Sequence, residues 1–415
     1  MRNRTGRNLR TVLLFLLFLS LARTEGPAQS ASPRSFPVIL VSLDGFRNDY
    51  LENTHCPNLR DLADSGVRAK WMVPSFPTKT FPNHYTIVTG LYPENHGIVS
   101  NTMYDPEFDA VFGLWKREEV TNGRWWGGEP LWVTAEKQGL KSATYFWPGS
   151  EAEIGGWRPS YWTRYDGSVP FTNRVNQVLA WLDLPPEQRP SFITLYFEEI
   201  DHAGHEFGPD FSACDSAVKL TDSALGMLVE GLRSRKIIDS VNVIVVSDHG
   251  MAPVEKSRTI WLDDYLNTDS VRIVDWGIVV SLWPSETEVD AIVKKLSVAH
   301  PHMKAFRKQE IPERFHYRNN RRIAPVLLIA DEGWTITRRG SGNAWRRRER
   351  GGNHGYDNQS VSMRALFIGR GPAFKTGVVV EPFENIHLYA LMCHLLGIQP
   401  APHDGHLETV KGVLQ

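Results

Sequence analysis

Three segments of the chain combine an almost continuous apolar run with an acidic residue directly after it. The runs cover residues 38–43, 192–197 and 241–247, and the acidic residues that follow them are Asp44, Glu198 and Asp248. Such runs are typical of strands that are buried on both faces of a parallel sheet. Because helical patterns lie between the runs, the chain is predicted to form an α/β sheet; those patterns cover residues 57–65 and 216–232.

Side chains that can bind metal ions gather at one edge of this predicted sheet. Ligands of α/β sheets bind beyond the carboxyl ends of the strands, so acidic residues there can converge although they are far apart in the sequence. Aspartate and histidine without cysteine suit zinc before magnesium. Taken singly, each is more readily explained as a polar strand end or a helix cap. Together they would suffice for two metal ions, and they are Asp44, Asp201, His205, Asp248, His249 and His354.

A smaller α+β lobe is predicted over residues 255–350, inserted before the last strand of the central sheet. Strand patterns at 277–283 and 325–330 and a helical pattern at 286–299 support it. The central sheet resumes with a strand at 363–368, followed by a helix at 385–396. The sequence therefore predicts a largely parallel central sheet flanked by helices, with a small inserted lobe. An arginine-rich loop at 338–350 is either solvated or attracts anionic substrates.

The first 30 residues are predicted to be a signal peptide rather than part of the fold. Arginines precede an apolar stretch at 12–22, and small residues at 28–31 offer a cleavage site. An uncleaved anchor is the alternative. Since no later apolar run approaches the ~20 residues of a membrane helix, the mature chain is expected to be secreted or periplasmic without stable membrane insertion. The catalytic domain is placed at residues 36–410.

Charge and cysteine content exclude several classes of protein. Lysine and arginine total 46 against 47 aspartate and glutamate residues, so a nucleic-acid partner held by bulk charge is not expected. The three cysteines exclude a thiolate zinc site and allow at most one disulfide. Cys393 lies in an apolar helical stripe and is predicted to be a buried thiol, whereas pairing of Cys56 with Cys214 is left open.

Thr80 is the candidate nucleophile. Pro82 opens an apolar run that ends at Thr89 and Gly90, which predicts a helix with Thr80 near its N-terminus. The free N–H groups at a helix N-terminus stabilise an anion, and a nearby metal ion would lower the pKa of the hydroxyl further. On the local sequence alone, an ordinary capping threonine is the more economical interpretation.

Six motifs in a fixed order identify a resemblance that covers nearly the whole mature chain, residues 37–405. The motifs are DGFR at 44–47, KTFPNH at 79–84, GLYPENHGI at 90–98, DxxGH at 201–205, SDHGM at 247–251 and HGYDN at 354–358. In this order they resemble the ectonucleotide pyrophosphatase/phosphodiesterase family of the alkaline phosphatase superfamily. The resemblance implies an alkaline-phosphatase-like α/β fold and an enzyme that hydrolyses nucleotide phosphodiester and pyrophosphate bonds to nucleoside 5′-monophosphates.

The resemblance also implies a site with two zinc ions per chain and a covalent intermediate on Thr80. One zinc would be held by Asp201, His205 and His354, and the other by Asp44, Asp248, His249 and the Thr80 oxygen. Asn101 matches the family asparagine that hydrogen-bonds a phosphate oxygen. Nearby histidines that match no ligand position are interpreted as structural, namely His84, His96 and His202.

The expected substrates are small-molecule nucleotides. Phe81 follows the nucleophile, and Trp147 and Tyr165 match positions at which the family stacks a nucleobase. A glycerophosphocholine or lysophospholipid diesterase is the main alternative, because Glu151 could contribute to a cage for a cationic head group. A monoesterase would need cations for a phosphate dianion, and Lys79 is the only nearby candidate. A sulfatase needs a Cys or Ser nucleophile, and neither occupies the position of Thr80. The complete set of metal ligands argues against a non-enzymatic binding module.

Overall fold

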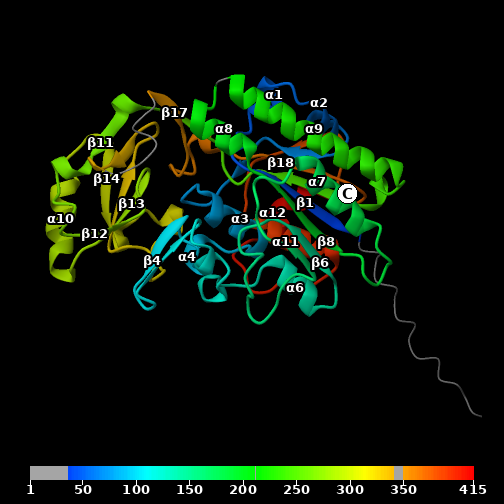
Figure 1. Ribbon diagram of the computed structural model, residues 1–415, viewed down its shortest axis with the longest axis horizontal. Coiled ribbons are helices and arrows are strands. Elements are labelled where there is room, and N and C mark those ends of the chain that lie inside the picture. The colour runs from blue at the N-terminus through cyan, green and yellow to red at the C-terminus, as the bar shows by residue number, and fades with distance from the viewer. Residues whose placement is uncertain (1–35, 211, 341–348) are drawn as a thin grey trace, which may run out of the picture. The chain divides into compact units, whose positions relative to one another are not determined.

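The computed structural model describes residues 36–210, 212–340 and 349–415 (Figure 1). The predicted signal peptide, residues 1–30, lies outside the described residues. Within the described residues, none of the helices combines the length and the apolar character that crossing a membrane requires.

A central sheet of eight strands is built around β1 (Val38–Leu43). Strand β1 pairs in parallel with β8 (Phe192–Phe197) on one side and with β9 (Asn242–Val246) on the other. Every residue of these three strands is buried, which confirms the prediction made from the unbroken apolar runs. The strand order is β19-β2-β18-β9-β1-β8-β6-β7.

The outer strands make the sheet mixed rather than fully parallel. On one side, β6 (Ser142–Tyr145) and β7 (Tyr161–Thr163) continue the parallel pairing. On the other side, β18 (Phe367–Arg370) runs antiparallel to both β9 and β2 (Val67–Ala69), and β19 (Val378–Val380) pairs with β2. The predicted strand at 363–368 therefore begins too early. Residues Val361–Met363 form a 3-10 helix, and the Met363 carbonyl accepts a hydrogen bond from the Gly250 N–H.

Helices cover both faces of the sheet, and alternate residues of β1 face opposite hydrophobic cores (Figure 1). Ile39, Val41 and Leu43 belong to one core, and Val38 and Leu40 belong to the other. The first core is closed by α2 (Pro57–Asp64), α7 (Phe171–Leu182), α8 (Glu199–Phe207) and α9 (Ser212–Ser234). The second is closed by α3 (Thr80–Thr89), α6 (Leu131–Lys137) and α11 (His387–Leu396).

A separate antiparallel sheet with its own hydrophobic core lies within the residues predicted as the inserted lobe. Its strands, in spatial order, are β12 (Arg272–Val274), β13 (Val279–Trp283), β15 (Val326–Ala330) and β14 (Met303–Arg307). Helix α10 (Val289–Leu296) is shorter than predicted, because Glu286–Glu288 form a 3-10 turn that Ser285 and Glu288 close as a capping box. Strands β11 (Thr259–Trp261) and β16 (Thr335–Thr337) pair beside this sheet.

Short elements lead into the candidate site. A hairpin of β4 (Thr102–Asp105) and β5 (Ala110–Gly113) follows Asn101, and β17 (Arg350–Asn353), paired with β10 (Ala252–Glu255), leads into His354. The remaining short helices and strands are α1 (Tyr50–Asn53), α4 (Pro93–His96), α5 (Arg117–Val120), α12 (Leu407–Val410), β3 (Met72–Val73) and β20 (Phe383–Glu384).

Two further predictions concern cysteine and arginine side chains. Cys56, Cys214 and Cys393 are all buried free thiols, and burial raises the pKa of Cys393 to about 12. In the arginine-rich loop, Arg338 pairs with Asp269, and Arg339 pairs with Asp263 and Asp264. The charge of these two arginines is therefore balanced locally, and residues 341–348 of that loop lie outside the described residues.

Candidate active site

The candidate acidic residues lie at the carboxyl ends of three adjacent strands. Asp44 follows β1, Asp201 lies in α8 after β8, and Asp248 follows β9. The backbone closes tightly here: the Gly45 N–H donates to Asp248 Oδ1 at 3.2 Å. Gly45 has φ +69°, and a Cβ at this position would lie 2.9 Å from the Asp201 Cα. A glycine at this point lets α8 approach the end of β1, which brings the carboxylates together.

Asp201, His205 and His354 form one group of metal-binding atoms, all within 4.8 Å of one another. The Asp201 Oδ1 lies 3.5 Å from His205 Nε2 and 3.6 Å from His354 Nε2. Each histidine uses its other nitrogen on a carbonyl: His205 Nδ1 lies 3.0 Å from the Gly352 oxygen and His354 Nδ1 lies 2.8 Å from the Thr78 oxygen. With Nδ1 as the donor, both Nε2 lone pairs face the centre of the group, as in metal-binding histidines.

A second group surrounds the hydroxyl of Thr80. His249 Nε2 lies 3.3 Å from Thr80 Oγ1, 2.9 Å from Asp248 Oδ2 and 3.6 Å from Asp44 Oδ1. The His249 ring stacks on the His354 ring at 3.6 Å between centroids, so the two groups are adjacent. The structure thus brings together all seven residues that the sequence proposed as metal ligands, Asp44, Thr80, Asp201, His205, Asp248, His249 and His354.

Burial and charge act on the protonation of this cluster. Burial, with the neighbouring rings of His249 and His205, holds the pKa of His354 well below its ordinary value, so this imidazole is neutral. Burial and the charges of Asp248 and Asp201 raise the pKa of Asp44. Burial alone would lower the pKa of His249, but the adjacent Asp248 carboxylate raises it.

The cluster fits a pair of bound cations. One carboxylate oxygen on each of Asp44, Asp201 and Asp248 is buried and accepts no well-oriented hydrogen bond from the described part of the chain. Buried carboxylates without partners are costly, and cations would satisfy all three at once. Aspartate and histidine donors suit zinc.

His84 contacts two residues of this cluster, Thr80 and Asp248. Its Nε2 contacts Ser42 Oγ at 2.8 Å, and its Nδ1 lies 2.9 Å from the Thr80 carbonyl and 3.3 Å from Asp248 Oδ2. Both ring nitrogens are therefore close to protein atoms, but His84 also forms a candidate metal-binding group with Asp44 and Asp248, so its structural role stays a prediction. His96 is likewise buried, with Nε2 3.0 Å from Thr86 Oγ1, whereas His202 lines the cavity described below.

Thr80 is the first residue of α3, which matches the predicted helix start. Pro82 falls in the first turn, and Gly90 closes the helix in a left-handed conformation at φ 66°. Asn101 lies beside this N-terminus: the Phe81 N–H donates to Asn101 Oδ1 at 2.9 Å. This contact fixes the orientation of the Asn101 amide, so that its NH2 group is the donor available to a ligand.

A buried ion pair that sequence reasoning missed joins the two segments that carry the candidate residues Thr80 and Asn101. The Asp275 carboxylate, between β12 and β13, pairs with Lys79 Nζ and accepts a hydrogen bond from Ser100 Oγ. The side chains of Lys79 and Asp275 are only 8% and 11% exposed. Lys79 precedes Thr80 and Ser100 precedes Asn101, so one carboxylate links the segments of the candidate nucleophile and the candidate phosphate-binding amide. A monoesterase would need the positive charge of Lys79 to bind a phosphate dianion, but Asp275 already neutralises this charge.

We expect Asp275→Asn to lower kcat on a nucleotide diester by about ten-fold with little change in KM. The variant loosens the contact between the segments that carry Thr80 and Asn101, and small misplacements of reacting groups are expensive. Steady-state kinetics on folded protein would measure it. Asp269→Asn is the matched control, because Asp269 pairs with Arg338 on the surface of the same lobe. An unchanged kcat in Asp275→Asn would contradict a positioning role.

A cavity of about 190 Å³ opens directly beside Thr80 and is rich in aromatic side chains. Phe81 lies next to the nucleophile, and Tyr165 is 40% exposed. Trp147 is only 4% exposed and donates its indole N–H to the His84 carbonyl at 3.0 Å, so it forms a fixed wall of the cavity. The remaining aromatic wall is formed by Phe146 and Tyr196.

Glu151 lines this cavity but is not available to a cationic head group. It forms an ion pair with Arg117, and its Oε1 accepts the Tyr165 backbone N–H at 3.1 Å. A choline group would have to compete with a guanidinium for this carboxylate. The cage required by the lipid-head-group alternative is therefore occupied by the protein's own cation.

Comparison with known proteins shows which protein family this chain resembles. A family model described as type I phosphodiesterase / nucleotide pyrophosphatase matches residues 38–357. A venom phosphodiesterase of Naja atra is 45% identical over 401 residues, covering 93% of this chain and 48% of the venom protein. Ectonucleotide pyrophosphatase/phosphodiesterase family member 3 of Rattus norvegicus is 44% identical over 411 residues, covering 94% of this chain and 46% of the rat protein. The chain spans about half the length of these curated relatives.

Solved structures show the same fold. Murine ectonucleotide pyrophosphatase/phosphodiesterase 5, as an inactive threonine-to-alanine variant in complex with AMP, matches with a TM-score of 0.87 and 37% identity, covering 92% of this chain and 100% of that chain. The human counterpart also matches with a TM-score of 0.87, covering 91% of this chain and 100% of that chain. These matches confirm the predicted α/β fold class.

Proposed function

This chain belongs to the type I phosphodiesterase/nucleotide pyrophosphatase family, and from that membership we propose that it hydrolyses nucleotide phosphodiester and pyrophosphate bonds to nucleoside 5′-monophosphates. The observation that carries the proposal is the position of Thr80 Oγ1, 3.3 Å from His249 Nε2 and at the mouth of an aromatic cavity. The AMP bound to the similar murine protein supports a nucleotide as the ligand.

Two zinc ions would complete the site. Asp201, His205 and His354 would hold one of them, and Asp44, Asp248, His249 and Thr80 would hold the other. When bound, zinc lowers the pKa of the threonine hydroxyl and neutralises charge on the phosphoryl oxygens. The buried, unpartnered carboxylate oxygens of this cluster support this assignment.

The chain's own residues then perform a double displacement. Thr80 Oγ1 loses its proton to solvent and attacks phosphorus, and the bond to the leaving oxygen breaks, which leaves the nucleotide esterified to Thr80. The Asn101 NH2 group and the backbone N–H of Thr80 donate to the non-bridging oxygens, where negative charge develops, whereas the Phe81 N–H is already used to hold Asn101. Water then attacks phosphorus from the vacated side, which releases the nucleoside 5′-monophosphate and restores the Thr80 hydroxyl.

Substrate choice follows from the aromatic cavity. Tyr165→Ala is expected to cost ~1–3 kcal/mol of transition-state binding on a nucleotide diester, because a stacked base contacts the exposed part of this ring. On an aryl phosphodiester that has no base, the variant should lose little of its transition-state binding. The measurement is kcat/KM on the nucleotide diester divided by kcat/KM on the aryl diester, in wild type and in the variant. Since both substrates react at Thr80, a change in this ratio reports only the contact with the base. Equal losses on both substrates would assign Tyr165 to the support of the fold instead.

Product identification tests the proposed function directly. The panel contains a nucleotide diester, a dinucleoside pyrophosphate, glycerophosphocholine, a phosphate monoester and a sulfate ester. Release of a nucleoside 5′-monophosphate from the first two substrates, and slow or absent turnover of the others, is expected. A preference for glycerophosphocholine would overturn the proposal in favour of the lipid-head-group alternative, against which the Glu151–Arg117 pair argues.

Export from the cytoplasm belongs to the same proposal. The basic and apolar pattern of residues 1–30 remains the prediction of a signal peptide, and the relatives carry the names of an ectoenzyme and of venom enzymes. Comparison of the mature N-terminus with the encoded one, by mass spectrometry of exported protein, would test cleavage near residues 28–31.

A further inference from the structure

We propose that a second cavity, beside the proposed active site, binds the leaving nucleoside of a dinucleotide substrate together with a further phosphate on that nucleoside. The inference rests on the proposed function and deepens it, because it names a class of substrate for the same site. The cavity has a volume of about 630 Å³. It is lined by Thr102, Tyr104, Asp109, Val111, Trp115, Arg272, Ile273, Val274, Asp275 and Trp276.

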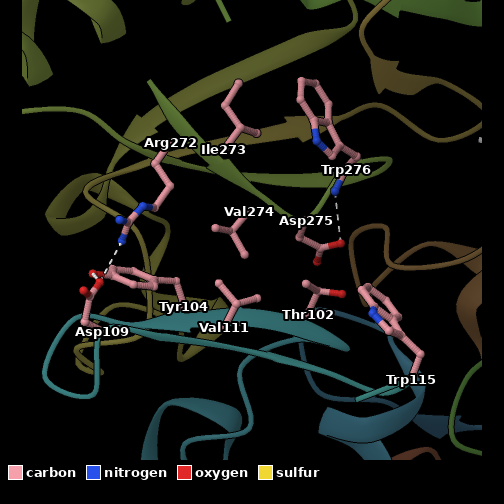
Figure 2. Close-up of a pocket in the computed structure, with 10 residues that line it drawn as sticks. All are labelled: Thr102, Tyr104, Asp109, Val111, Trp115, Arg272, Ile273, Val274, Asp275 and Trp276. Atoms are coloured by element: carbon pink, nitrogen blue, oxygen red, sulfur yellow. Dashed lines mark hydrogen bonds and ion pairs between the residues drawn. The ribbon is translucent and has the colours of Figure 1, made fainter. Parts of the chain in front are cut away.

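Figure 2 shows that the lining side chains come from two facing elements. The β4–β5 hairpin contributes Thr102, Tyr104 and Val111, and β12 contributes Arg272 and Val274. Trp115 and Trp276 lie at the same end of the cavity as Thr102 and Asp275, whereas Arg272, Tyr104 and Asp109 lie at the other end (Figure 2). One end of the cavity therefore carries two tryptophan rings, and the other carries the ion pair of Arg272 and Asp109 beside Tyr104.

The aromatic end is directly joined to the catalytic residues. Thr102 follows Asn101, and Asp275 contacts Lys79 and Ser100. The Leu114 N–H donates to the Asn101 carbonyl at 3.1 Å; Leu114 lines the cavity beside Thr80, and the next residue, Trp115, lines the second cavity. Because consecutive residues, Leu114 and Trp115, line the two cavities, the cavities are neighbours, and the proposal is that one extended ligand occupies both.

The lobe segment after Asp275 also touches the loop of His354. A Cβ placed on Gly355 would lie 3.3 Å from Lys79 Cε and 3.4 Å from Ile278 Cβ. The leaving oxygen must depart on the side of phosphorus opposite Thr80, and we assign its stabilisation to the group of Asp201, His205 and His354. The segment that supplies Asp275 and Trp276 to the cavity therefore borders the leaving-group side of the site.

The lining residues match the chemistry of a nucleoside phosphate. Trp115 is 63% exposed, and exposed aromatic rings beside a binding groove stack nucleobases without regard to sequence. The Arg272 guanidinium lies 4.2 Å from the centre of the Tyr104 ring and pairs with Asp109 at 3.4 Å. Because Arg272 and Asp109 are 50% and 79% exposed, their pair is weak and a phosphate can replace the carboxylate.

The test compares three substrates that share the retained nucleotide. They are the p-nitrophenyl ester of thymidine 5′-phosphate, the dinucleotide TpT, and pTpT, which carries a 5′-phosphate on the leaving thymidine. We expect Trp115→Ala to lower kcat/KM about ten-fold for TpT and pTpT and to leave the p-nitrophenyl ester unchanged. Trp115→Phe should recover most of the loss. Arg272→Ala should lower kcat/KM about two- to five-fold for pTpT alone.

Trp162→Ala is the matched control, because this tryptophan is 43% exposed on the edge strand β7 and lines neither cavity. A Trp115→Ala variant that loses activity equally on all three substrates would overturn the inference, because the hairpin would then only support Asn101. Unchanged kinetics on all three would also overturn it. If the wild type cleaves none of the three substrates, the proposed function itself is refuted. That result is distinguishable from the two outcomes above, in which the wild type is active.

Discussion

Replacing Thr80 with alanine is expected to lower turnover of nucleotide diesters by more than about 100-fold, because the variant lacks the oxygen that attacks phosphorus. Thr80 Oγ1 is the hydroxyl oxygen 3.3 Å from His249 Nε2, at the first position of α3. KM should change little, since Phe81 and Tyr165 in the adjacent cavity are untouched. Single-turnover measurements should also show that no nucleotide becomes attached to the variant.

Two further variants make this result interpretable. Thr80→Ser keeps the hydroxyl and should retain part of the activity. Thr172→Ala, at an exposed position of α7, removes a threonine hydroxyl away from the site and should behave as wild type. Near-normal turnover by Thr80→Ala would show that water attacks phosphorus directly and would refute the covalent mechanism.

Removal of bound metal is the second change with a large expected effect. Chelation should abolish hydrolysis and also destabilise the protein, because the buried carboxylates of Asp44, Asp201 and Asp248 would then lie together without the cations that neutralise them. For a site that had been filled at 100 times its Kd, the free energy of unfolding should fall by about 3 kcal/mol. Thermal unfolding measures this loss independently of activity.

Metal identity can be separated from metal dependence. Zinc should restore both activity and thermal stability, and magnesium should restore neither, because histidine and aspartate donors suit zinc. Elemental analysis should find two zinc ions per chain. Fully active protein that contains no transition metal would contradict the two-zinc proposal.

The small lobe has a part in this site that its own fold does not require. Its Asp275 has φ 67°, a conformation that is uncommon outside glycine, and its carboxylate reaches across to Lys79 and Ser100. The adjacent Trp276 is one of the residues that line the second cavity. The lobe thus contacts the segments of Thr80 and Asn101, and in our proposals it contributes to the positioning of the nucleophile and to the choice of leaving group.

The amino-acid sequence alone determined the core of the sheet and the identity of the metal-binding candidates. The apolar runs at 38–43, 192–197 and 241–247 predicted three buried strands, because strands covered on both faces need apolar side chains at nearly every position. Acidic residues directly after such runs must meet at one edge of a parallel sheet. Pro82 and Gly90 likewise bounded α3 and placed Thr80 at its first turn.

Only the tertiary structure decided which charges and rings are available to a ligand. From the sequence, Lys79 was a candidate to bind an anion and Glu151 a candidate to bind a cation, but Asp275 neutralises Lys79 and Arg117 neutralises Glu151. Trp147 is almost fully buried and lines the cavity with its indole N–H bonded to the His84 carbonyl, whereas the Tyr165 ring is 40% exposed; stacking of a base on Trp147 stays a prediction. The Lys79–Asp275 pair joins residues 196 positions apart. Local periodicity reports which face of an element is buried, but the partner of a polar side chain depends on how distant elements pack, and no pattern along the chain records that.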